Sequence, residues 1–268
     1  MQNRHQTPDL YFREQSYTTS HHVIPFIREV MTLNDTTRVL EVGCGHGGNV
    51  ESFLDIGCET TGLDINPDDI RTAESFLAGH PNRSRLTLIS TDIYDANVEE
   101  LGRFDLIVMK DVIEHIHDQT KFMGFIKTFL NEKGRIFLGF PPWYMPFGGH
   151  QQVCESRFLS ILPFFHLLPV PLYRSVLRMF GESKSRVEEL LEVKETGISI
   201  ERFRRIIINE GYRVDREQFF LISPNYEIKF KMRPVRQIRV LSSISFLRNF
   251  LTTCCYYLVR KGPIAPID

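Results

Sequence analysis

A glycine-rich stretch, RVLEVGCGHGGN at residues 38–49, is the first pattern in the sequence that could do chemistry. Gly43, Gly45 and Gly48 fit the G-x-G-x-x-G spacing of dinucleotide-binding loops, and Asp64 follows at the distance that this pattern requires. Glycines at such positions let the backbone approach a ligand closely. The pattern predicts a site for a cofactor that contains adenosine, either a nicotinamide dinucleotide or another molecule.

The charge beside this loop distinguishes the two kinds of cofactor. Glu41 directly precedes the loop, and its carboxylate would repel a pyrophosphate, which prefers bare N–H groups at a helix N-terminus. The same carboxylate would attract a cofactor that carries an ammonium and a sulfonium, as S-adenosylmethionine does. Asp64 suits a ribose diol in either case, because a carboxylate accepts hydrogen bonds from two hydroxyls. The sequence therefore favours S-adenosylmethionine, and an NAD(P)-dependent oxidoreductase is the alternative.

Polar residues farther along the chain are candidates for the same site. In STDIY, residues 90–94, Asp92 could accept a hydrogen bond from the amino group of an adenine while Ile93 packs on the ring. His150, in the sequence GGHQQ, has an ordinary pKa of about 6.5, which suits a general base acting on a hydroxyl group at neutral pH. A loop histidine that hydrogen-bonds the backbone is the alternative.

The sequence EHIHD at residues 114–118 contains ligand types that metals use. On the helix expected there, His115 and His117 would point about 200° apart around the helix axis, so they could not hold one ion. The pattern H-E-x-x-H does not occur in the sequence. We therefore predict no metal site.

Five short apolar runs are predicted to be strands, and they alternate with helical patterns through residue 140. The predicted strands are 38–42, 59–64, 86–90, 104–110 and 135–140, and the predicted helices are 22–33, 49–57, 67–79 and 111–131. This alternation is typical of an α/β fold with a doubly wound, mostly parallel sheet and helices on both faces. Ligands of such sheets bind at the carboxyl ends of the strands, where Glu41, Asp64, Asp92 and Lys110 fall.

The alternation stops after residue 140, where a loop rich in proline and glycine follows. The apolar region 156–180 is either a cap that shelters an apolar acceptor or a second small core. Tyr11, Phe12 and Tyr17 are similarly either parts of a lid over the cofactor or aromatic packing under a helix. The last predicted elements are a helix at 199–211 and an antiparallel pair of strands at 212–223 and 254–261.

Four motifs together resemble a known family. EVGCGHG, GLDIN, STDI and KDVIEHI, in this order, resemble the class I S-adenosylmethionine-dependent methyltransferases, and the resemblance is greatest to the small-molecule type with a VLEH-like signature after strand four. It covers residues 35–150 strongly and the remainder of the chain more weakly. It implies a seven-stranded, mostly parallel sheet in the order 3-2-1-4-5-7-6, with strand 7 antiparallel and a helical cap inserted after strand 5.

The resemblance also implies which residues bind the cofactor. Glu41, Gly43, Cys44 and Gly45 would line its methionine part, Asp64 its ribose, and Ile65, Asp92 and Ile93 its adenine, with Lys110, Asp111 and His115 near the sulfonium and the acceptor. The expected reaction is methyl transfer by in-line displacement to a small molecule, with O-methylation favoured and an apolar or lipid-linked acceptor possible. A noncatalytic protein that binds a membrane or a partner through the same fold is a further alternative.

The same resemblance divides the chain into four parts. These are an N-terminal helical segment or lid at 1–34, a cofactor-binding Rossmann-like core at 35–150, an apolar cap at 151–198 and a C-terminal completion of the sheet at 199–268. Residues 224–268 contain eight Lys or Arg and two acidic residues. Residues 224–251 in particular mix basic and apolar types, as segments that lie on anionic membranes do, although a solvated face is the alternative.

Composition excludes several classes of protein. The chain has 268 residues with 42% hydrophobic and 24% charged types, which is the composition of a globular protein. A formal net charge of −1 gives no general reason to expect nucleic-acid binding. Five cysteines without a C-x-x-C pair, and an N-terminus without the features of a secretory signal, predict a reduced, cytoplasmic protein. The sequence gives no indication of the oligomeric state.

Overall fold

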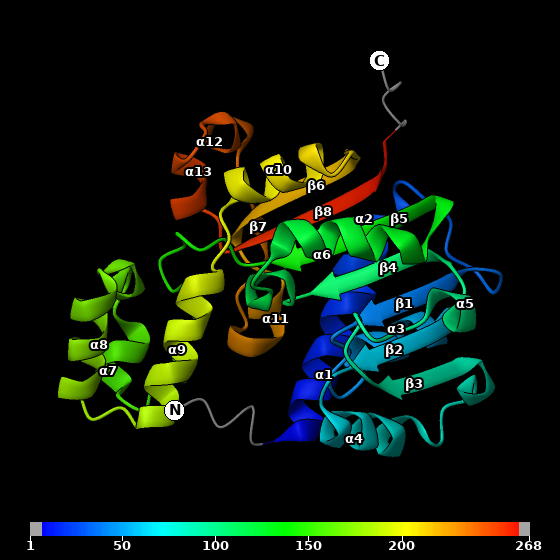
Figure 1. Cartoon of the computed structure of the whole chain (residues 1–268), viewed down its shortest axis with the longest axis horizontal. Coiled ribbons are helices and arrows are strands. Elements are labelled where there is room, and N and C mark those ends of the chain that lie inside the picture. The colour runs from blue at the N-terminus through cyan, green and yellow to red at the C-terminus, as the bar shows by residue number, and fades with distance from the viewer. Residues whose placement is uncertain (1–6, 263–268) are drawn as a thin grey trace.

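The computed structural model describes residues 7–262 and shows one mixed sheet with helices on both faces (Figure 1). The strands lie in the order β3-β2-β1-β4-β5-β8-β6-β7. They are β1 Arg38–Val42, β2 Glu59–Asp64, β3 Leu86–Ser90, β4 Phe104–Lys110, β5 Leu130–Phe140, β6 Tyr212–Ile222, β7 Val235–Arg236 and β8 Cys254–Lys261. The five strands from β3 to β5 are parallel, and β8 is antiparallel to both β5 and β6.

The sheet confirms the predicted strand order, with β8 in the place of the seventh strand. The count differs by one, because the two-residue strand β7 pairs with the outer edge of β6. β6 and β8 form the expected antiparallel pair, and β8 lies inside the sheet between β5 and β6. The predicted fifth strand is also longer than expected, since β5 begins at Leu130 and not at residue 135.

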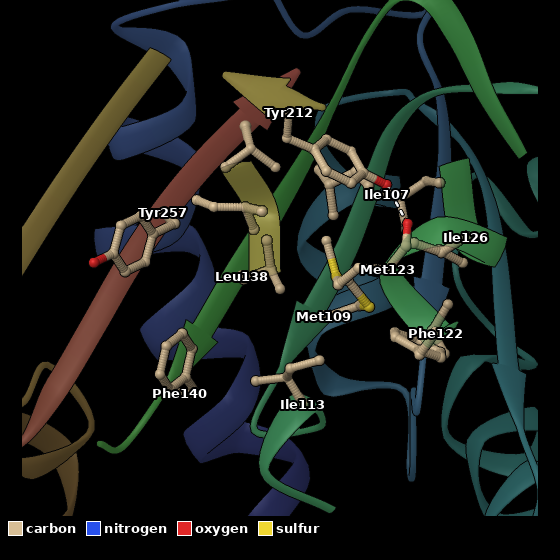
Figure 2. Close-up of a cluster of buried hydrophobic side chains, with 14 of the residues drawn as sticks. Ile107, Met109, Ile113, Phe122, Met123, Ile126, Leu138, Phe140, Tyr212 and Tyr257 are labelled. Atoms are coloured by element: carbon tan, nitrogen blue, oxygen red, sulfur yellow. Dashed lines mark hydrogen bonds between the residues drawn. The ribbon is translucent and has the colours of Figure 1, made fainter. Parts of the chain in front are cut away.

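Both faces of the sheet are buried, which explains why its central strands are continuous apolar runs. On one face, β4 and β5 contribute Ile107, Met109 and Leu138 to the largest core cluster (Figure 2). The Tyr212 hydroxyl is buried at the edge of this cluster and donates a hydrogen bond of 2.7 Å to the Met123 carbonyl. The partner satisfies the one polar atom that this aromatic ring brings into the core.

Several helices begin or end at capping residues that the sequence carries. Around the core the helices are α1 Pro8–Thr18, a π-helical turn Thr19–Val23, α2 Ile24–Arg28, α3 Gly48–Asp55, α4 Pro67–Leu77, α5 Val98–Leu101, α6 Gln119–Ile126, α10 Ile200–Asn209, α11 Asn225–Phe230, α12 Arg239–Ser243 and α13 Leu247–Phe250. The Ser199 hydroxyl caps α10 by accepting a hydrogen bond from the Arg202 N–H at 3.1 Å. Gly211, which follows the end of the same helix, takes a φ of 70°.

The long helix predicted at 111–131 is wrong. The chain instead forms a 3-10 turn at Ile113–His115, the helix α6, and a second 3-10 turn at Lys127–Phe129. α6 begins at residue 119 because the Asp118 carboxylate caps it, accepting from the Lys121 N–H at 3.0 Å. Asp111, with a φ of 59°, has a left-handed backbone that no α-helix contains.

The region after β5 forms a helical cap of α7 Arg157–Ile161, α8 Val170–Met179 and α9 Lys184–Thr196 (Figure 1). Its buried side chains make a separate core cluster that includes Cys154, Phe165, Tyr173 and Leu190. Of the two alternatives for the apolar region 156–180, the second small core is therefore present. The cap also contributes residues to a cavity, as described below.

Gly48 allows the N-terminal helix to reach the sheet. A Cβ at this position would overlap the Phe12 carbonyl oxygen and lie 2.7 Å from the Gln15 Cβ, so α1 packs directly on the start of α3. This glycine, the third of the G-x-G-x-x-G pattern, serves helix packing in the structure.

Gly48→Ala should therefore destabilise the protein, because overpacking of a close helix contact typically costs 1–3 kcal/mol, or about 2. The measurement is urea unfolding followed by circular dichroism. Gly79→Ala is the matched control, since a Cβ at Gly79 meets nothing within 4 Å. Equal midpoints for Gly48→Ala and the unchanged protein would contradict the packing role.

Candidate functional site

The glycine loop after β1 is fixed by hydrogen bonds to the end of β2. Gly43 and Gly45 have φ values of 72° and 51°, which favour glycine. The Gly43 N–H donates to the Leu63 carbonyl at 2.8 Å, and the Gly45 N–H donates to the Asp64 carboxylate at 2.8 Å. A Cβ on Gly45 would meet nothing within 4 Å, so the loop faces open space beside Asp64.

The Glu41 carboxylate is fully buried at the carboxyl end of β1. Its Oε1 accepts a hydrogen bond of 2.6 Å from the Asn49 amide, whose oxygen accepts one of 2.6 Å from the Thr19 hydroxyl. Oε2 has no hydrogen-bond partner among the described residues. Burial raises the pKa of Glu41 to about 8, although the Asn49 hydrogen bond and Lys110 act in the opposite direction. An unpartnered buried carboxylate oxygen next to this loop suits a cationic group of a ligand.

Four other predicted cofactor residues differ in what they can offer. The Cys44 side chain is buried in an apolar cluster with Val50 and Leu54, and Ile93 is buried in the main core. Only the main chain of these two residues could face a ligand. Ile65 is 69% exposed at the end of β2, and the Asp92 carboxylate accepts from the Tyr94 N–H at 2.9 Å.

Lys110 and Asp111 form a buried ion pair at the end of β4, with 3.0 Å between Nζ and Oδ2. Burial lowers the pKa of Lys110, but Asp111 outweighs this effect and leaves that pKa raised. Burial likewise raises the pKa of Asp111, but Lys110 outweighs it and leaves that pKa lowered. Both side chains are therefore charged at neutral pH.

The structure brings His115 and His150 together with Glu114, from two separate segments. The two histidine rings are 4.8 Å apart between centroids, and the ligand atoms of the three residues all lie within 4.8 Å of one another. Both Glu114 oxygens are buried without a hydrogen-bond partner among the described residues, and burial together with Asp111 raises the Glu114 pKa well above its usual range. Burial lowers the pKa of His115.

The helical premise used to exclude a metal at residues 114–118 is wrong. His117 lies outside any helix and pairs with Glu192 at 3.6 Å, while His115 has His150 as its neighbour. The carboxyl and two imidazole groups are donors that a divalent cation could use. The absence of a metal stays a prediction from the sequence.

A cavity of about 510 Å³ lies against this cluster, between the sheet edge, the cap and the C-terminal segment. The residues that line it include Tyr11, Lys110, Asp111, Glu114, His115, Trp143, His150, Arg186, Glu189, Tyr226 and Lys229. The predicted site residues thus divide into two groups. Lys110, Asp111, His115 and His150 line the cavity, whereas Glu41, Gly43, Cys44, Gly45, Asp64, Ile65, Asp92 and Ile93 do not.

Several cavity residues were not predicted from the sequence. Glu114 was considered only as a metal ligand, and Tyr226 and Lys229 come from α11, which packs against α1 far away in the sequence. Of the three aromatic residues considered for a lid, Tyr11 lines the cavity and contacts the His46 ring edge-on at 5.7 Å. Phe12 packs in a core cluster, and Tyr17 stacks on His21 at 4.1 Å.

Comparison with known proteins supports the reading of this edge of the sheet. Residues 12–144 match the family model described as a methyltransferase domain. Ubiquinone biosynthesis O-methyltransferases are similar: that of Xanthomonas oryzae pv. oryzae (strain PXO99A) is 30% identical over 101 residues, 38% of this chain and 41% of that protein. That of Rhodopseudomonas palustris (strain BisB5) is 33% identical over 90 residues, 32% of this chain and 33% of that protein. The chain belongs to the class I S-adenosylmethionine-dependent methyltransferases.

This methyltransferase also shares its fold with solved structures. Magnesium protoporphyrin IX methyltransferase from Synechocystis PCC 6803 with bound SAH superposes with a TM-score of 0.54 at 12% identity, over 94% of this chain and 87% of that one. A glycopeptide N-methyltransferase complexed with S-adenosylmethionine gives 0.53 at 13% identity, over 91% of this chain and 94% of that one. The cofactor is S-adenosylmethionine and not a nicotinamide dinucleotide. The alignments span less than half the length of the curated relatives.

Glu41→Gln tests the burial of the carboxylate. Because the folded pKa of about 8 exceeds the ordinary 4.5, the Glu41 contribution to stability falls as pH rises between these values. The neutral glutamine escapes this loss and can still accept from Asn49. The variant should gain up to ~4 kcal/mol relative to the unchanged protein between about pH 5 and 8, at about 1.4 kcal/mol per pKa unit.

The measurement is urea unfolding of the ligand-free protein across this pH range. Glu59→Gln is the control, since this carboxylate is exposed beside Arg38 at the start of β2. Its stability difference from the unchanged protein should stay nearly constant with pH. Parallel pH profiles for Glu41→Gln and the unchanged protein would show that the carboxyl is not held in its neutral form by burial.

Proposed function

We propose that the chain transfers a methyl group from S-adenosylmethionine to a hydroxyl oxygen of a small molecule bound in the 510 Å³ cavity. The observation that carries this proposal is the position of His150 and His115 on the cavity wall, next to the Lys110–Asp111 pair at the end of β4. Two imidazole groups at that place can accept a proton from an acceptor hydroxyl. The names of the O-methyltransferase relatives support the same choice of acceptor atom.

The residues along β1 and β2 would hold the methionine and ribose parts of the cofactor. Glu41 offers an unpartnered buried oxygen to the ammonium group. Gly43 and Gly45 allow close approach, and the open space at the position of a Gly45 Cβ supports this role. Asp64 accepts one backbone hydrogen bond at each oxygen, from Gly45 and Asn66, and its remaining lone pairs suit a ribose diol.

The adenine would lie farther along the same edge. Ile65 presents an exposed apolar side chain for one face of the ring, and Asp92 supplies an acceptor for the exocyclic amine. Ile93 and Cys44 would contribute main-chain atoms, since their side chains are buried. When bound, the cofactor supplies a methyl group that is already activated by the sulfonium.

The task of the protein is then positioning, exclusion of water and removal of one proton. Holding the acceptor in line with the methyl group can lower the barrier by roughly 7–11 kcal/mol. His150 would take the hydroxyl proton on a ring nitrogen, which contributes about 10²–10⁴ in rate. Burial lowers the pKa of the neighbouring His115 and so favours its neutral form. A neutral His115 does not repel the proton that His150 takes from the acceptor.

The acceptor has both apolar and charged parts. Trp143 and Tyr226 supply aromatic surface to the cavity, but Arg186, Glu189 and Lys229 line it as well. Arg186 pairs with Glu189, and Lys229 Nζ lies 3.9 Å from the Glu14 carboxylate, but the buried Nε of Arg186 has no hydrogen-bond partner in the described part of the chain. A polar group of the acceptor suits this wall better than an apolar one. This composition revises the expectation of an apolar acceptor and favours an amphipathic one.

The division of the chain into parts at 1–34, 35–150, 151–198 and 199–268 remains a proposal. Residues 224–251 are further proposed to contact a membrane surface peripherally. Their basic and apolar side chains support this contact, since the exposed Ile238, Arg239 and Val240 follow one another in sequence. Among residues 7–262 there is no helix with the length and apolar character needed to cross a bilayer.

Calorimetric titration with S-adenosylmethionine and S-adenosylhomocysteine tests cofactor binding. We expect micromolar dissociation constants, on the order of 10⁻⁶ M, and a loss of at least about tenfold in Asp64→Ala. Asp68→Ala, an exposed carboxylate paired with Arg71 on α4, is the control and should bind normally. NAD(H) should give no heat. Normal binding by Asp64→Ala would remove this residue from the site.

His150→Asn tests the base, because asparagine tolerates the left-handed backbone that His150 adopts with a φ of 53°. After an acceptor has been found by screening with labelled methyl groups, kcat should fall by about 10²–10⁴ and recover partly at high pH, where the hydroxyl ionises by itself. Binding of S-adenosylmethionine should be unchanged. His117→Asn, which pairs with Glu192, is the control. An unchanged kcat in His150→Asn, with cofactor binding also unchanged, would exclude His150 as the base without contradicting cofactor binding.

A further inference from the structure

Large exposed apolar side chains are concentrated in two stretches of the chain. Of the 22 in the described part, eight lie at 147–180 and eight at 230–247. The most exposed include Ile161, Leu172 and Met179 in the cap and Ile238 and Val240 in the C-terminal segment, with Met179 75% and Val240 70% exposed. In Figure 1, α7 and α8 lie at the same end of the molecule as α12 and α13.

Aromatic contacts connect the two stretches at one place, where the cap meets α13. The Phe164 ring from the cap lies 6.0 Å from the Phe250 ring on α13, measured between centroids, and the Phe250 ring lies 5.4 Å from that of Phe246. Tyr144, in the loop after β5, contacts Phe246 at 5.1 Å. We call the exposed side chains of residues 158–180 and 230–247 the docking face.

Two phenylalanines at this junction have unfavourable backbones. Phe164 and Phe246 have φ values of 63° and 66°, which bulky residues rarely adopt. Hydrogen bonds hold both: the Phe164 N–H donates to the Pro146 carbonyl at 2.7 Å, and the Phe246 N–H donates to Glu201 at 2.8 Å. Such strain persists only where the surroundings enforce it, and it is concentrated at functional sites.

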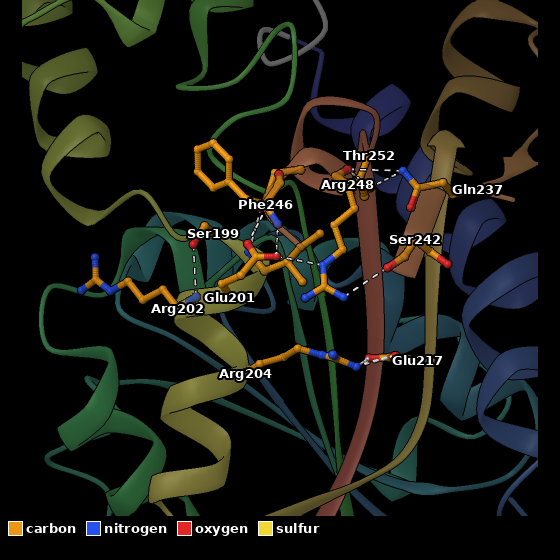
Figure 3. A network of polar contacts seen from close by, with 12 residues as sticks. Ser199, Glu201, Arg202, Arg204, Glu217, Gln237, Ser242, Phe246, Arg248 and Thr252 are labelled. Carbon is orange, nitrogen blue, oxygen red and sulfur yellow. Dashed lines mark hydrogen bonds and ion pairs between the residues drawn. The ribbon is translucent and has the colours of Figure 1, made fainter. Parts of the chain in front are cut away.

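The network around Glu201 fixes the exposed Phe246 ring in place (Figure 3). Besides the Phe246 N–H, the Glu201 carboxylate accepts hydrogen bonds from Arg248 Nε at 2.9 Å and from the Asn249 amide at 2.5 Å. Arg248 is itself buried and bonded to the Ser242 carbonyl at 3.2 Å. Buried polar groups thus hold an aromatic residue whose side chain is 52% exposed. Folding alone does not require this exposure.

The charge of the docking face is strongly positive. Residues 158–180 and 230–247 contain six Lys or Arg and no acidic residue, in a chain whose formal net charge is −1. Arg236 and Arg239 are exposed beside Ile238 and Val240, and in α8 the exposed Arg174 and Arg178 accompany Leu172 and Met179. Apolar side chains flanked by arginines are typical of helices that lie in the interface of an anionic bilayer.

We propose that the docking face binds the surface of an anionic lipid bilayer, with the cap contributing as much as residues 224–251. A second copy of the chain is a poorer occupant, because a twofold interface places the same patch against itself and would juxtapose the arginines. The loop after β5 connects the docking face with the site: its Tyr144 ring contacts Phe246, and its Phe147 is exposed and lines the cavity. This proposal is independent of the methyl acceptor and of catalysis.

Sedimentation with phosphatidylcholine vesicles, with and without phosphatidylglycerol, tests the proposal. The intact chain should bind only the anionic vesicles, and binding should weaken as salt is raised. Three variants are compared: Leu172→Ser/Met179→Ser in the cap, Ile238→Ser/Val240→Ser in the C-terminal segment, and Arg236→Gln/Arg239→Gln. Ile208→Ser is the control, an apolar residue that is 68% exposed on α10 outside the docking face.

In the arginine variant the partition coefficient should fall about 30-fold, because each of the two basic residues contributes about fivefold. In each serine variant it should fall at least about tenfold. Calorimetry with S-adenosylmethionine shows whether each variant keeps its site. Loss only in the C-terminal variants would overturn the contribution of the cap. Failure of the intact chain to bind anionic vesicles, equal binding to neutral ones, or a dimer that the serine variants dissociate would each overturn the lipid assignment.

Discussion

The hydrogen bond from the Asn49 amide to the buried Glu41 carboxylate connects the parts on which the site depends. Glu41 ends β1, Asn49 lies in α3, and Thr19 in the π-helical turn donates to Asn49 in turn. A carboxylate withdrawn from water is costly unless it is hydrogen-bonded, so the N-terminal helix has to close over the sheet edge. Gly48 makes that closure sterically possible, since any side chain there would collide with α1. One oxygen of Glu41 is nevertheless left without a partner, and the free energy of this defect favours a bound cation.

The same edge has a division of charge that suits a cationic cofactor and a neutral acceptor hydroxyl. Asp64 and Glu41 lie on the β1–β2 side of the edge, away from the cavity lining, and no basic residue pairs with Asp64 in the described part of the chain. On the β4 side, Lys110 neutralises Asp111 inside the protein. The histidine pair therefore lies next to a charge-balanced wall, and burial lowers the pKa of His115. In the sequence, Glu41 favoured a sulfonium cofactor over a pyrophosphate, and the four motifs taken together supported the same choice.

The strands could be predicted from the sequence because parallel strands covered on both faces are apolar runs that end at glycines or acidic residues, whereas their order was implied only by the resemblance to the methyltransferase family. β1 ends before Gly43, and β2 ends at Asp64. The histidine cluster could not be predicted, since it depends on a loop that brings His150 back to a turn 35 positions earlier. The prediction of one helix at 111–131 was wrong, although Asp118 is a typical N-cap residue and marks the true start of α6. The apolar residues keep a helical spacing on both sides of Asp118, and this spacing hid the start. The Cys44 and Ile93 side chains are buried in core clusters, and no local pattern in the sequence shows that they point away from the edge of the sheet.

The cap has two faces with different chemistry, and the contrast between them argues for its role. Its inner helix α9 places Arg186 and Glu189 on the cavity, whereas its outer helix α8 exposes Leu172 and Met179 to the surroundings. A second small core needs neither an exposed apolar helix nor two phenylalanines held in left-handed conformations. An amphipathic acceptor, by contrast, has an apolar part that can remain in lipid while its polar part enters a charged cavity. Phe147, in the loop after β5, is both exposed to the surroundings and part of the cavity wall, so this loop is where the surface and the charged cavity meet.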